Sequence, residues 1–198
     1  EIESLPTEVV DALRNGDLGD GPVRNSDAKE TGNKFGELGM DKDLMRKIYA
    51  INGTNVLVND TKGIQGLHET RELIIEAFNE VCKKGPIADE PVQGMFVRLT
   101  DAKLHEDAIH RGPAQTIPAV RNGIKGAMMR AKTVLLEPMQ KAFVSVPNDW
   151  LGQVTREVTN RRGIIEDMPS EGDVTTVVGV LPIAETFGFS NDIRAASQ

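Results

Sequence analysis

The most regular pattern of apolar and polar positions in the chain lies between residues 67 and 84. Apolar residues recur there at i, i+3, i+4, i+7 and i+8, which places them along one face of an α-helix. Glutamates fill the opposite face, and two lysines followed by a glycine suit the carboxyl end of a helix. The stretch therefore predicts a helix whose core face consists of Ile74, Ala77, Phe78, Val81 and Cys82.

Shorter patterns on the amino-terminal side of this helix predict further elements. Residues 6–15 place apolar side chains on one helical face, and residues 26–50 contain two short helical patterns separated at Gly39. Residues 55–59 are rich in β-branched side chains and are bounded by asparagines, which predicts a strand. The core candidates of the second stretch are Leu44, Ile48 and Tyr49.

A strand and another helix are predicted after the central helix. Residues 93–104 alternate in polarity, and the alternation changes phase near Asp101, which indicates a β-bulge. Thr116-Ile117-Pro118 has the form of a helix start with proline in the first turn, and this helix is expected to run from Pro118 to about Lys132. Its apolar stripe consists of Val120, Ile124, Ala127, Met128 and Ala131.

The pattern changes at Glu137-Pro138, where a second and smaller set of elements begins. This βαββα order is that of a ferredoxin-like unit that lacks its last strand. The chain is therefore predicted to be an α+β protein of two domains, residues 1–136 and residues 137–198. The elements of the second domain are a strand at 142–146, a helix at 149–163, strands at 164–168 and 174–181, and a partial helix at 184–196.

Composition indicates a globular protein rather than a disordered or membrane-spanning one. Of the 198 residues, 39% are hydrophobic and 27% are charged, and no stretch is apolar enough to span a bilayer. The only aromatic residues are six Phe, one Tyr and one Trp, which argues against a base-stacking platform for single-stranded nucleic acid. Cys82 is the single cysteine, so we expect no disulfide framework and no cysteine-based zinc site, and a reducing compartment is favoured.

Charge is distributed unevenly along the chain. No acidic residue occurs between His110 and Leu136, although the whole chain carries a formal net charge of −7. The five basic residues of this stretch leave −12 for the remainder, because −7 minus +5 is −12. A basic segment in an acidic chain suggests an anionic partner, of which nucleic-acid phosphate is the commonest. The basic residues are Arg111, Arg121, Lys125, Arg130 and Lys132.

Two of the three histidines lie in the stretch from Leu104 to Gln115. Gly112-Pro113 follows them and interrupts regular structure, so His105 and His110 are expected on a loop between a strand and a helix, a frequent position for functional residues. A zinc-protease motif needs histidines four apart on one helical face, whereas these two are five apart. We therefore predict no metal site and no catalytic residue. A hydrolase that uses His105, Glu106 and His110 is kept as an alternative.

The turn after the predicted strand at 55–59 has the sequence Asp60-Thr61-Lys62-Gly63, which resembles a phosphate-sensing turn of GTPases. No Gly-x-x-x-x-Gly-Lys-Ser/Thr motif occurs in the chain, so a phosphate cradle is not expected. We therefore predict an ordinary turn and no binding of GTP by this chain alone.

The histidine loop also carries a resemblance to a known family. Residues 105–115, followed by Ile117-Pro118, resemble the tip loop in domain IV of elongation factor 2, the archaeal and eukaryotic translocase. Further similar motifs lie at 59–65, 160–163 and 187–189, so the resemblance covers nearly the whole chain, and Gly112-Pro113-Ala114 is similar to the archaeal branch. The core of the family signature is Asp-x-x-His-Arg-Gly, present here as Asp107, His110, Arg111 and Gly112.

The resemblance implies a role in protein synthesis. Elongation factor 2 uses GTP hydrolysis to move messenger and transfer RNA through the ribosome, and its domain IV holds the codon–anticodon helix in the decoding site. The tip histidine, here His110, would be converted to diphthamide, the residue that diphtheria-type toxins ADP-ribosylate. The loop that would contact RNA and the ribosome comprises His105, Asp107, His110, Arg111, Gly112, Pro113 and Gln115, and a basic RNA-facing side would comprise Arg121, Lys125 and Lys132.

The resemblance also implies the architecture and the partners. Residues 1–136 would form domain IV, with a βαβ crossover of the rare left-handed sense, and residues 137–198 would form most of domain V. The chain would be a piece of a longer factor whose G domain binds GTP and Mg²⁺, and it would need no cofactor of its own. Expected partners of this cytoplasmic monomer are ribosomal RNA, the tRNA–mRNA duplex, diphthamide-synthesis enzymes and ADP-ribosylating toxins, with no membrane contact. A paralogous GTPase that serves ribosome biogenesis or another RNA machine is the alternative.

Overall fold

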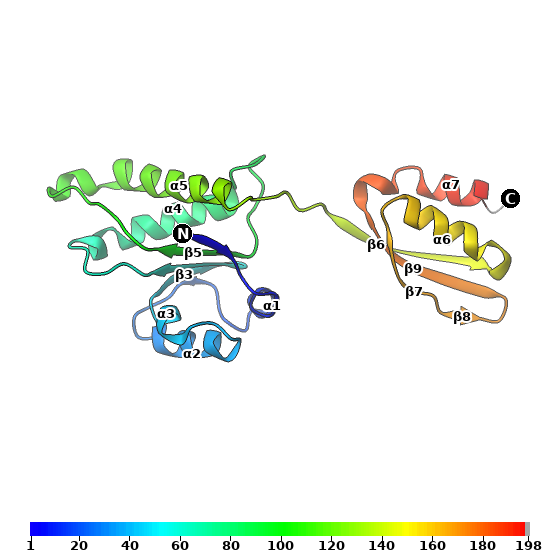
Figure 1. Ribbon diagram of the computed structural model, residues 1–198, viewed down its shortest axis with the longest axis horizontal. Helices are drawn as coiled ribbons and strands as arrows, with labels where there is room; N and C mark the ends of the chain where they lie inside the picture. The colour runs from blue at the N-terminus through cyan, green and yellow to red at the C-terminus, as the bar shows by residue number, and fades with distance from the viewer. Residues whose placement is uncertain (197–198) are drawn as a thin grey trace. The chain divides into compact units, whose positions relative to one another are not determined.

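The computed structural model describes residues 1–196, which form two units, each with its own β-sheet (Figure 1). Unit 1 comprises Glu1–Val134, and unit 2 begins at Leu135, two residues before the predicted start of the second domain at Glu137. The α+β class predicted from the sequence is confirmed, because each unit combines helices with a sheet.

The sheet of unit 1, all of which is described, has five strands in the order β1-β5-β4-β3-β2. The strands are β1 (Ile2–Ser4), β2 (Gly21–Pro22), β3 (Ile48–Asn52), β4 (Asn55–Asn59) and β5 (Met95–Leu99). Neighbouring strands are antiparallel except β4 and β5, which are parallel. The strand predicted at residues 55–59 is thus confirmed as β4.

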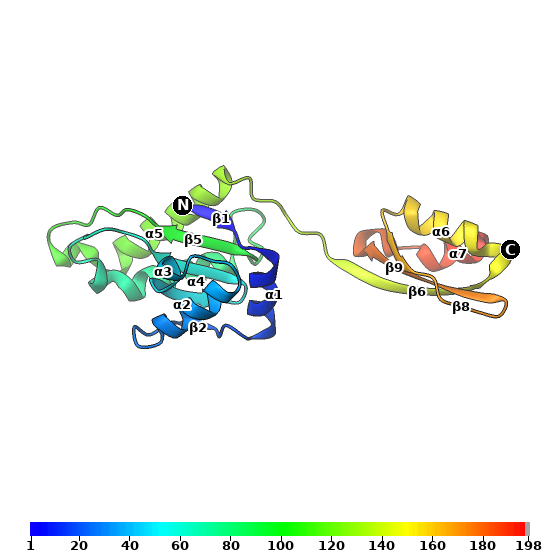
Figure 2. The ribbon, with the colours of Figure 1, turned by 60° about the horizontal axis from the view of Figure 1, so that its bottom comes forward.

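Helices cover both faces of this sheet, so unit 1 has three layers (Figures 1 and 2). The helices are α1 (Thr7–Asn15), α2 (Ala28–Glu37), α3 (Lys42–Met45), α4 (Arg71–Lys83) and α5 (Pro113–Arg130). Two 3-10 turns, η1 (Leu67–Thr70) and η2 (Ala108–Arg111), precede α4 and α5 respectively. α4 and α5 share one face of the sheet, and α1 to α3 share the other.

Strand β4 shows why both faces are covered. Its apolar residues are consecutive instead of alternating, as in a strand that is buried on both sides. Leu57 belongs to the core under α4 and α5, whereas Val56 and Val58 belong to the core under α1 to α3. The core face predicted for α4 is also confirmed, since Ile74, Ala77, Phe78, Val81 and Cys82 are all buried.

Strands β4 and β5 are joined through η1 and α4, and their parallel pairing makes this connection a βαβ crossover. The pairing runs from Val56 opposite Phe96 to Asn59 opposite Leu99. The left-handed sense that the family resemblance implies for this crossover stays a prediction.

Two predictions for the strands of unit 1 are wrong. Residues 48–52 form β3 instead of extending a helix, because α3 is a short turn that ends at Met45 and β4 offers a partner strand. Residues 100–104 lie outside β5, because β4 ends opposite Leu99 and β1 does not reach that far. The bulge predicted near Asp101 is therefore absent, since the strand has already ended.

Helix α5 begins at Pro113 and not at the predicted Pro118. Gly112 is its N-cap, with φ −73° and ψ 176°, and Pro113 occupies the first helical position, where a missing N–H group costs no hydrogen bond. Pro118 lies inside the helix, where its missing N–H removes one backbone hydrogen bond. Both prolines fit the sequence pattern of a helix start, so the pattern alone could not choose between them.

The sheet of unit 2 has the antiparallel order β6-β9-β7, and β8 also pairs with β9. Its strands are β6 (Met139–Pro147), β7 (Ile164–Asp167), β8 (Ser170–Glu171) and β9 (Val174–Pro182). The helices are α6 (Leu151–Asn160) and α7 (Phe189–Ala196), preceded by the 3-10 turns η3 (Asn148–Trp150) and η4 (Ile183–Thr186). Apart from the two-residue β8, this is the predicted βαββα order of a ferredoxin-like unit.

Unit 2 has a small core of its own. Both of its helices lie on one face of the sheet (Figures 1 and 2). Val154 and Val158 of α6 pack there against Val146, Val177 and Leu181 of the sheet. No helix within residues 1–196 has the length and apolar character needed to cross a lipid bilayer.

Candidate functional site

The two histidines lie on residues 104–112, here called the tip loop, which connect the segment after β5 to α5. The loop ends in the turn η2, and Asp107 caps this turn, because its carboxylate accepts the backbone N–H of Ile109 at 3.1 Å. The carbonyl oxygen of Asp107 also accepts the N–H of His110 at 3.2 Å. The local sequence thus folds into a short turn that leaves Ile109 and His110 exposed.

His105 and His110 lie next to each other on this loop. Their ring centroids are 4.5 Å apart, and the rings meet edge to face at 67°. Nδ1 of His105 accepts the backbone N–H of Asp107 at 3.1 Å, which holds the ring in place. Both side chains are exposed, so the imidazole of His110 is open to a large partner.

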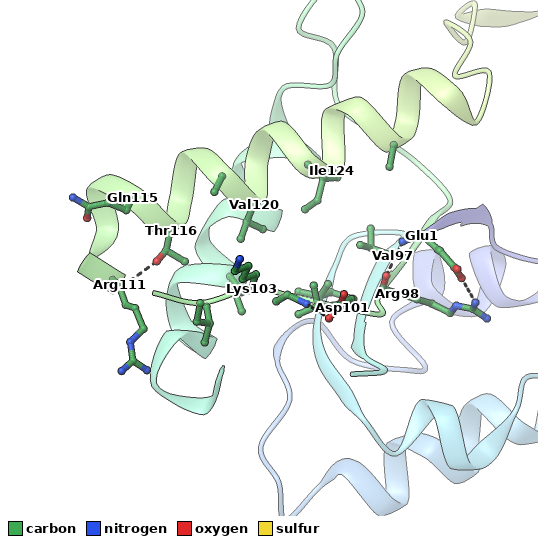
Figure 3. A pocket seen from close by; sticks show the side chains of 18 of the residues that line it. Glu1, Val97, Arg98, Asp101, Lys103, Arg111, Gln115, Thr116, Val120 and Ile124 are labelled. Atoms are coloured by element: carbon green, nitrogen blue, oxygen red, sulfur yellow. Dashed lines mark hydrogen bonds and ion pairs between the residues drawn. The ribbon is translucent and has the colours of Figure 1, made fainter. Parts of the chain in front are cut away.

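Arg111 turns inward although its neighbour His110 is exposed. Its Nη1 lies 3.0 Å from a carboxylate oxygen of Glu69, and its Nη2 donates to the carbonyl oxygen of Glu106 at 3.1 Å. Only 15% of its side chain is exposed, and Figure 3 shows this side chain extending away from α5. The positive charge of Arg111 is therefore paired within unit 1, whereas the basic stretch of sequence around it suggests an unpaired charge.

Gly112, Pro113 and Gln115 begin α5. The carbonyl oxygen of Gly112 accepts the N–H groups of Gln115 and Thr116 at 3.2 and 2.9 Å. Oγ1 of Thr116 donates to the carbonyl oxygen of Arg111 at 3.0 Å, a bond drawn in Figure 3. Pro113 and Gln115 are exposed, whereas Gly112 is partly buried. These bonds fix the carboxyl end of the tip loop to the first turn of α5.

The predicted basic side of α5 is only partly free. Nη1 of Arg121 lies 2.8 Å from a carboxylate oxygen of Glu80 on α4, and Nζ of Lys125 lies 3.8 Å from one of Asp89. Lys132 follows the helix, is exposed and forms no ion pair with any residue in the described part of the chain. Acidic residues from other segments thus offset part of the positive charge that is concentrated along the sequence.

A cavity of about 510 Å³ borders the tip loop, between β5, α5 and residues 101–105 (Figure 3). Its walls are mainly apolar side chains, and His105 and His110 are among the residues that line it. The tip loop therefore borders a hollow, while its first residue, Leu104, packs against the core under α4 and α5. The apolar walls are formed by Leu57, Ile74, Val97, Leu99, Leu104, Val120 and Ile124.

Other side chains with chemical potential do not gather at this loop. His68 lies exposed on η1. Among residues 1–196, no three or more His, Cys, Asp or Glu side chains are grouped so that they could hold a metal ion. Cys82 is buried in α4, and burial raises the pKa of its thiol to about 12, so the thiol stays protonated at neutral pH.

Glu69 and Gly66 are site residues that the sequence pattern did not single out. Glu69 pairs with Arg111, and the backbone of Gly66 lies against the same guanidinium, with φ at +76°. No spacing rule connects these positions to the tip loop, because the contact arises from the packing of η1 against the loop. A glycine directly before a helix indicates a turn and does not identify a partner for Arg111.

Family models match both units. The model described as "Elongation factor G, domain IV" matches residues 22–132, and the model described as "Elongation factor G C-terminus" matches residues 134–198. The two models together cover all the elements of both units except β1, α1 and the first residue of β2.

Curated relatives match the whole length of the chain. Elongation factor 2 of Methanoregula boonei is 52% identical and that of Picrophilus torridus 50% identical, each over 197 residues and 100% of this chain. Elongation factor 2 of Pyrococcus horikoshii is 44% identical over 196 residues, or 99% of this chain. The chain spans 26% or 27% of the length of these relatives, about a quarter. The chain therefore belongs to the elongation factor 2 family, as the sequence resemblance implies, and it corresponds to domain IV and the C-terminal domain of that factor.

Proposed function

We propose that this chain is the ribosome-engaging part of a translational translocase. It consists of C-terminal domains of a translation elongation factor, and the proposal assigns contact with the decoding site to the tip loop. The observation that carries the proposal is the exposure of His110 on a turn that Asp107 caps. In this role the loop holds the codon–anticodon helix, while GTP hydrolysis elsewhere in the full-length factor drives the movement of tRNA and mRNA.

His110 is the residue that we assign to conversion into diphthamide. An enzyme must reach the imidazole to modify it, and an exposed ring on a short turn meets that requirement. The edge of the His105 ring restricts the positions that the His110 ring can adopt. The proposed partners at this residue are diphthamide-synthesis enzymes and, after modification, ADP-ribosylating toxins.

The proposed RNA contacts are directed to shape and backbone rather than to base sequence. His110 and Gln115 are exposed at the tip loop and the start of α5, and Arg130 and Lys132 offer positive charge at the other end of that helix. Such groups recognise phosphate and sugar without reading bases. Arg111 contributes less than a free arginine would, because Glu69 already pairs with its guanidinium.

The remaining assignments follow from the same role. GTP and Mg²⁺ would be bound by the G domain of the full-length factor, and this chain would hold no cofactor and catalyse no reaction. It would act in the cytoplasm as a monomer, on ribosomal RNA and the tRNA–mRNA duplex, without membrane contact.

The first test is a mass spectrum of the tryptic peptide Leu104–Arg111 from protein purified from its native host. Trypsin cleaves after Lys103 and Arg111, so this peptide isolates His110 together with His105. We expect extra mass on His110 that corresponds to diphthamide, and the same chain made in a bacterial host, which lacks the pathway, gives the unmodified reference. An unmodified His110 from the native host would contradict the assignment and favour a paralogous GTPase.

The second test separates translocation from GTP hydrolysis. His110→Ala in the full-length factor should slow single-round translocation on the ribosome, because the tip loop loses its modified side chain. Hydrolysis of GTP should keep its wild-type rate, since the G domain is unchanged. Translocation at the wild-type rate would contradict a role for the tip loop in the decoding site.

A further inference from the structure

We infer that Glu69 is a positioning residue for His110 and that it acts through Arg111. The inference rests on the proposed function, because it concerns how the tip loop presents the same histidine to a modifying enzyme. Glu69 belongs to η1, which precedes α4, and it is therefore remote in sequence from the loop that it supports.

The first step concerns the guanidinium of Arg111. It is held between two segments, with Glu69 Oε2 at 3.0 Å from Nη1 and the carbonyl oxygen of Glu106 at 3.1 Å from Nη2. Its Nε is buried and has no hydrogen-bond partner among residues 1–196. A guanidinium on a side chain that is 15% exposed needs a nearby negative charge, and Glu69 is the carboxylate that forms an ion pair with it.

The second step concerns the room that η1 leaves for this guanidinium. Gly66 immediately precedes η1 and has a φ of +76°, a conformation that favours glycine. A Cβ atom at this position would collide with Nη1 of Arg111. The backbone of Gly66 and the carboxylate of Glu69 thus form one seat for Arg111, here called the Arg111 seat.

The third step connects the Arg111 seat to His110. The carbonyl oxygen of Arg111 accepts the hydroxyl of Thr116, and its side chain is held in the seat, so both its backbone and its side chain are fixed. His110 directly precedes it, and its N–H is bonded to Asp107. With Arg111 held inward, the turn keeps His110 exposed, and loss of the seat leaves the Asp107 cap, the His105 contact and the Thr116 hydrogen bond to order the loop.

The test compares two matched substitutions, Glu69→Gln and Glu80→Gln. Both glutamates pair with an arginine, at 3.0 and 2.8 Å, and their side chains are 48% and 42% exposed. Glu80 pairs with Arg121 on α5, whereas the carboxylate paired with Arg111 is that of Glu69, which makes Glu80→Gln the control. The 198-residue chain is made unmodified in a bacterial host and then incubated with diphthamide-synthesis enzymes of an archaeal relative.

The rate of mass gain on the peptide Leu104–Arg111 is measured at several concentrations of the chain. We expect Glu69→Gln to raise the apparent KM about three- to tenfold with kcat unchanged, because a smaller fraction of the loops presents His110 correctly. Glu80→Gln should have the wild-type KM. If each substitution only removed a surface ion pair, KM would not rise in Glu69→Gln alone. Equal KM values for Glu69→Gln and Glu80→Gln therefore overturn the inference.

Gly66→Ala is the second variant, because it displaces the guanidinium from the Arg111 seat without removing a charge. Gly66→Ala should raise KM, as Glu69→Gln does. Glu69→Asp keeps the carboxylate, so its KM should lie closer to that of the wild-type chain than the KM of Glu69→Gln does. A wild-type KM for Gly66→Ala contradicts the inference.

Failure of the proposed function gives a different result. The wild-type chain would then gain no mass, while full-length elongation factor 2 of the relative is modified in the same assay. Hydrogen exchange still tests positioning in that case. Amides of residues 107–112 should exchange about threefold faster or more in Glu69→Gln than in Glu80→Gln, as expected when a local contact is lost. Equal exchange in the two variants overturns the inference.

Discussion

Asp107 and Asp41 each cap a short turn in unit 1, and they differ in what the turn supports. The carboxylate of Asp107 accepts one backbone N–H, in a turn whose side chains are largely exposed. That of Asp41 accepts the N–H groups of Asp43 and Leu44 at 2.8 and 3.1 Å, and its turn places Met45 in the core. Alanine substitution at these two positions should therefore have different effects, one on the local order of the tip loop and the other on the global stability of unit 1.

We expect Asp107→Ala to loosen the tip loop and to leave the free energy of unfolding of unit 1 nearly unchanged. Asp41→Ala should lower that free energy by about 1 kcal/mol, the usual effect of losing an N-cap. Urea unfolding measures the global effect, and hydrogen exchange of the His110 amide measures the local one. A loss of global stability in Asp107→Ala as large as that in Asp41→Ala would show that the tip loop is part of the cooperative core.

Gly163 occupies a position in unit 2 that has no room for a side chain. A Cβ atom there would lie 2.6 Å from the carbonyl oxygen of Val158 and 3.0 Å from Cγ of Leu181. Gly152, in the first turn of α6, has no heavy atom within 4 Å of the corresponding point. Alanine at these two glycines should therefore have opposite effects on the stability of unit 2.

We expect Gly163→Ala to destabilise unit 2 by about 1–3 kcal/mol, because backbone and core atoms must shift to admit the methyl group. Gly152→Ala should be neutral or stabilise the unit by up to about 1 kcal/mol, since alanine favours the helix. Trp150 is the single tryptophan and lies in unit 2, so its fluorescence during thermal unfolding reports on this unit. Equal unfolding midpoints for Gly163→Ala and Gly152→Ala would show that the atoms around Gly163 can shift to admit the methyl group.

At the scale of elements, the sequence predicts a helix or strand correctly where one hydrophobic pattern continues without interruption. The segments 67–84 and 55–59 are η1 with α4 and β4, respectively, as their patterns predict. Leu44 and Ile48 also have a helical spacing, but the chain leaves the helix after Met45 and Ile48 begins β3. A pattern of one turn cannot distinguish one helix from a short turn followed by a strand, because both bury residues four apart.

The position of the candidate site was more predictable than its contacts. The order of strand, loop and helix, together with the Gly112-Pro113 break, placed His105 and His110 on an exposed loop. The ion pair between Arg111 and Glu69 depends on how η1 packs against that loop, which no local pattern determines. Residues that act through tertiary packing therefore stayed invisible in the sequence.

Glu137 lies on the segment that leads into β6, and its carboxylate pairs with an arginine that follows α6. Arg162 follows α6 with a φ of +58°, and its Nη1 and Nη2 donate to the two carboxylate oxygens of Glu137, each at 2.8 Å. This is the forked geometry in which an arginine binds a carboxylate most strongly. The hydrogen bonds from Arg162 lower the pKa of Glu137 below its ordinary value.

The lowered pKa gives the pair a defined dependence on pH. Because the folded pKa is below the unfolded one, the stabilisation is present above the ordinary value of about 4.3 and is lost as the pH falls through the folded pKa. We expect an NMR titration of the Glu137 carboxyl to have its midpoint below the ordinary value, and Arg162→Ala to restore that value. High salt should reduce the difference. A wild-type midpoint at the ordinary value would mean that the fork does not persist in solution.

Over the whole molecule, the separation of charge is smaller than the sequence suggests. Of the five basic residues between positions 110 and 136, three pair with acids of other segments, namely Arg111 with Glu69, Arg121 with Glu80 and Lys125 with Asp89. Among the described residues, Arg130 and Lys132 form no ion pair, so they carry the remaining positive charge of this stretch. Under the proposed function, attraction of RNA along α5 should therefore come mainly from the carboxyl end of the helix.

The two units have separate cores, and a leucine occupies a central place in each. Leu57 is 1% exposed in the core under α4 and α5, and Leu181 is 0% exposed beside Val154 and Val158 of α6. Truncation of a buried leucine to alanine costs about 2–5 kcal/mol. For a unit as small as unit 2, a loss of this size lowers the unfolding midpoint by about 8 °C or more.

We expect Leu181→Ala to lower the midpoint of the Trp150 fluorescence transition by about 8 °C or more. Hydrogen exchange in α4, which reports on unit 1, should change much less. Leu57→Ala should have the reverse effect, with faster exchange in α4 and a smaller shift in the Trp150 transition. The reason is that each substitution opens a cavity in one core and leaves the packing of the other intact. If both substitutions affected both probes equally, the chain would unfold as one cooperative body, and separate cores would not define separate folding units.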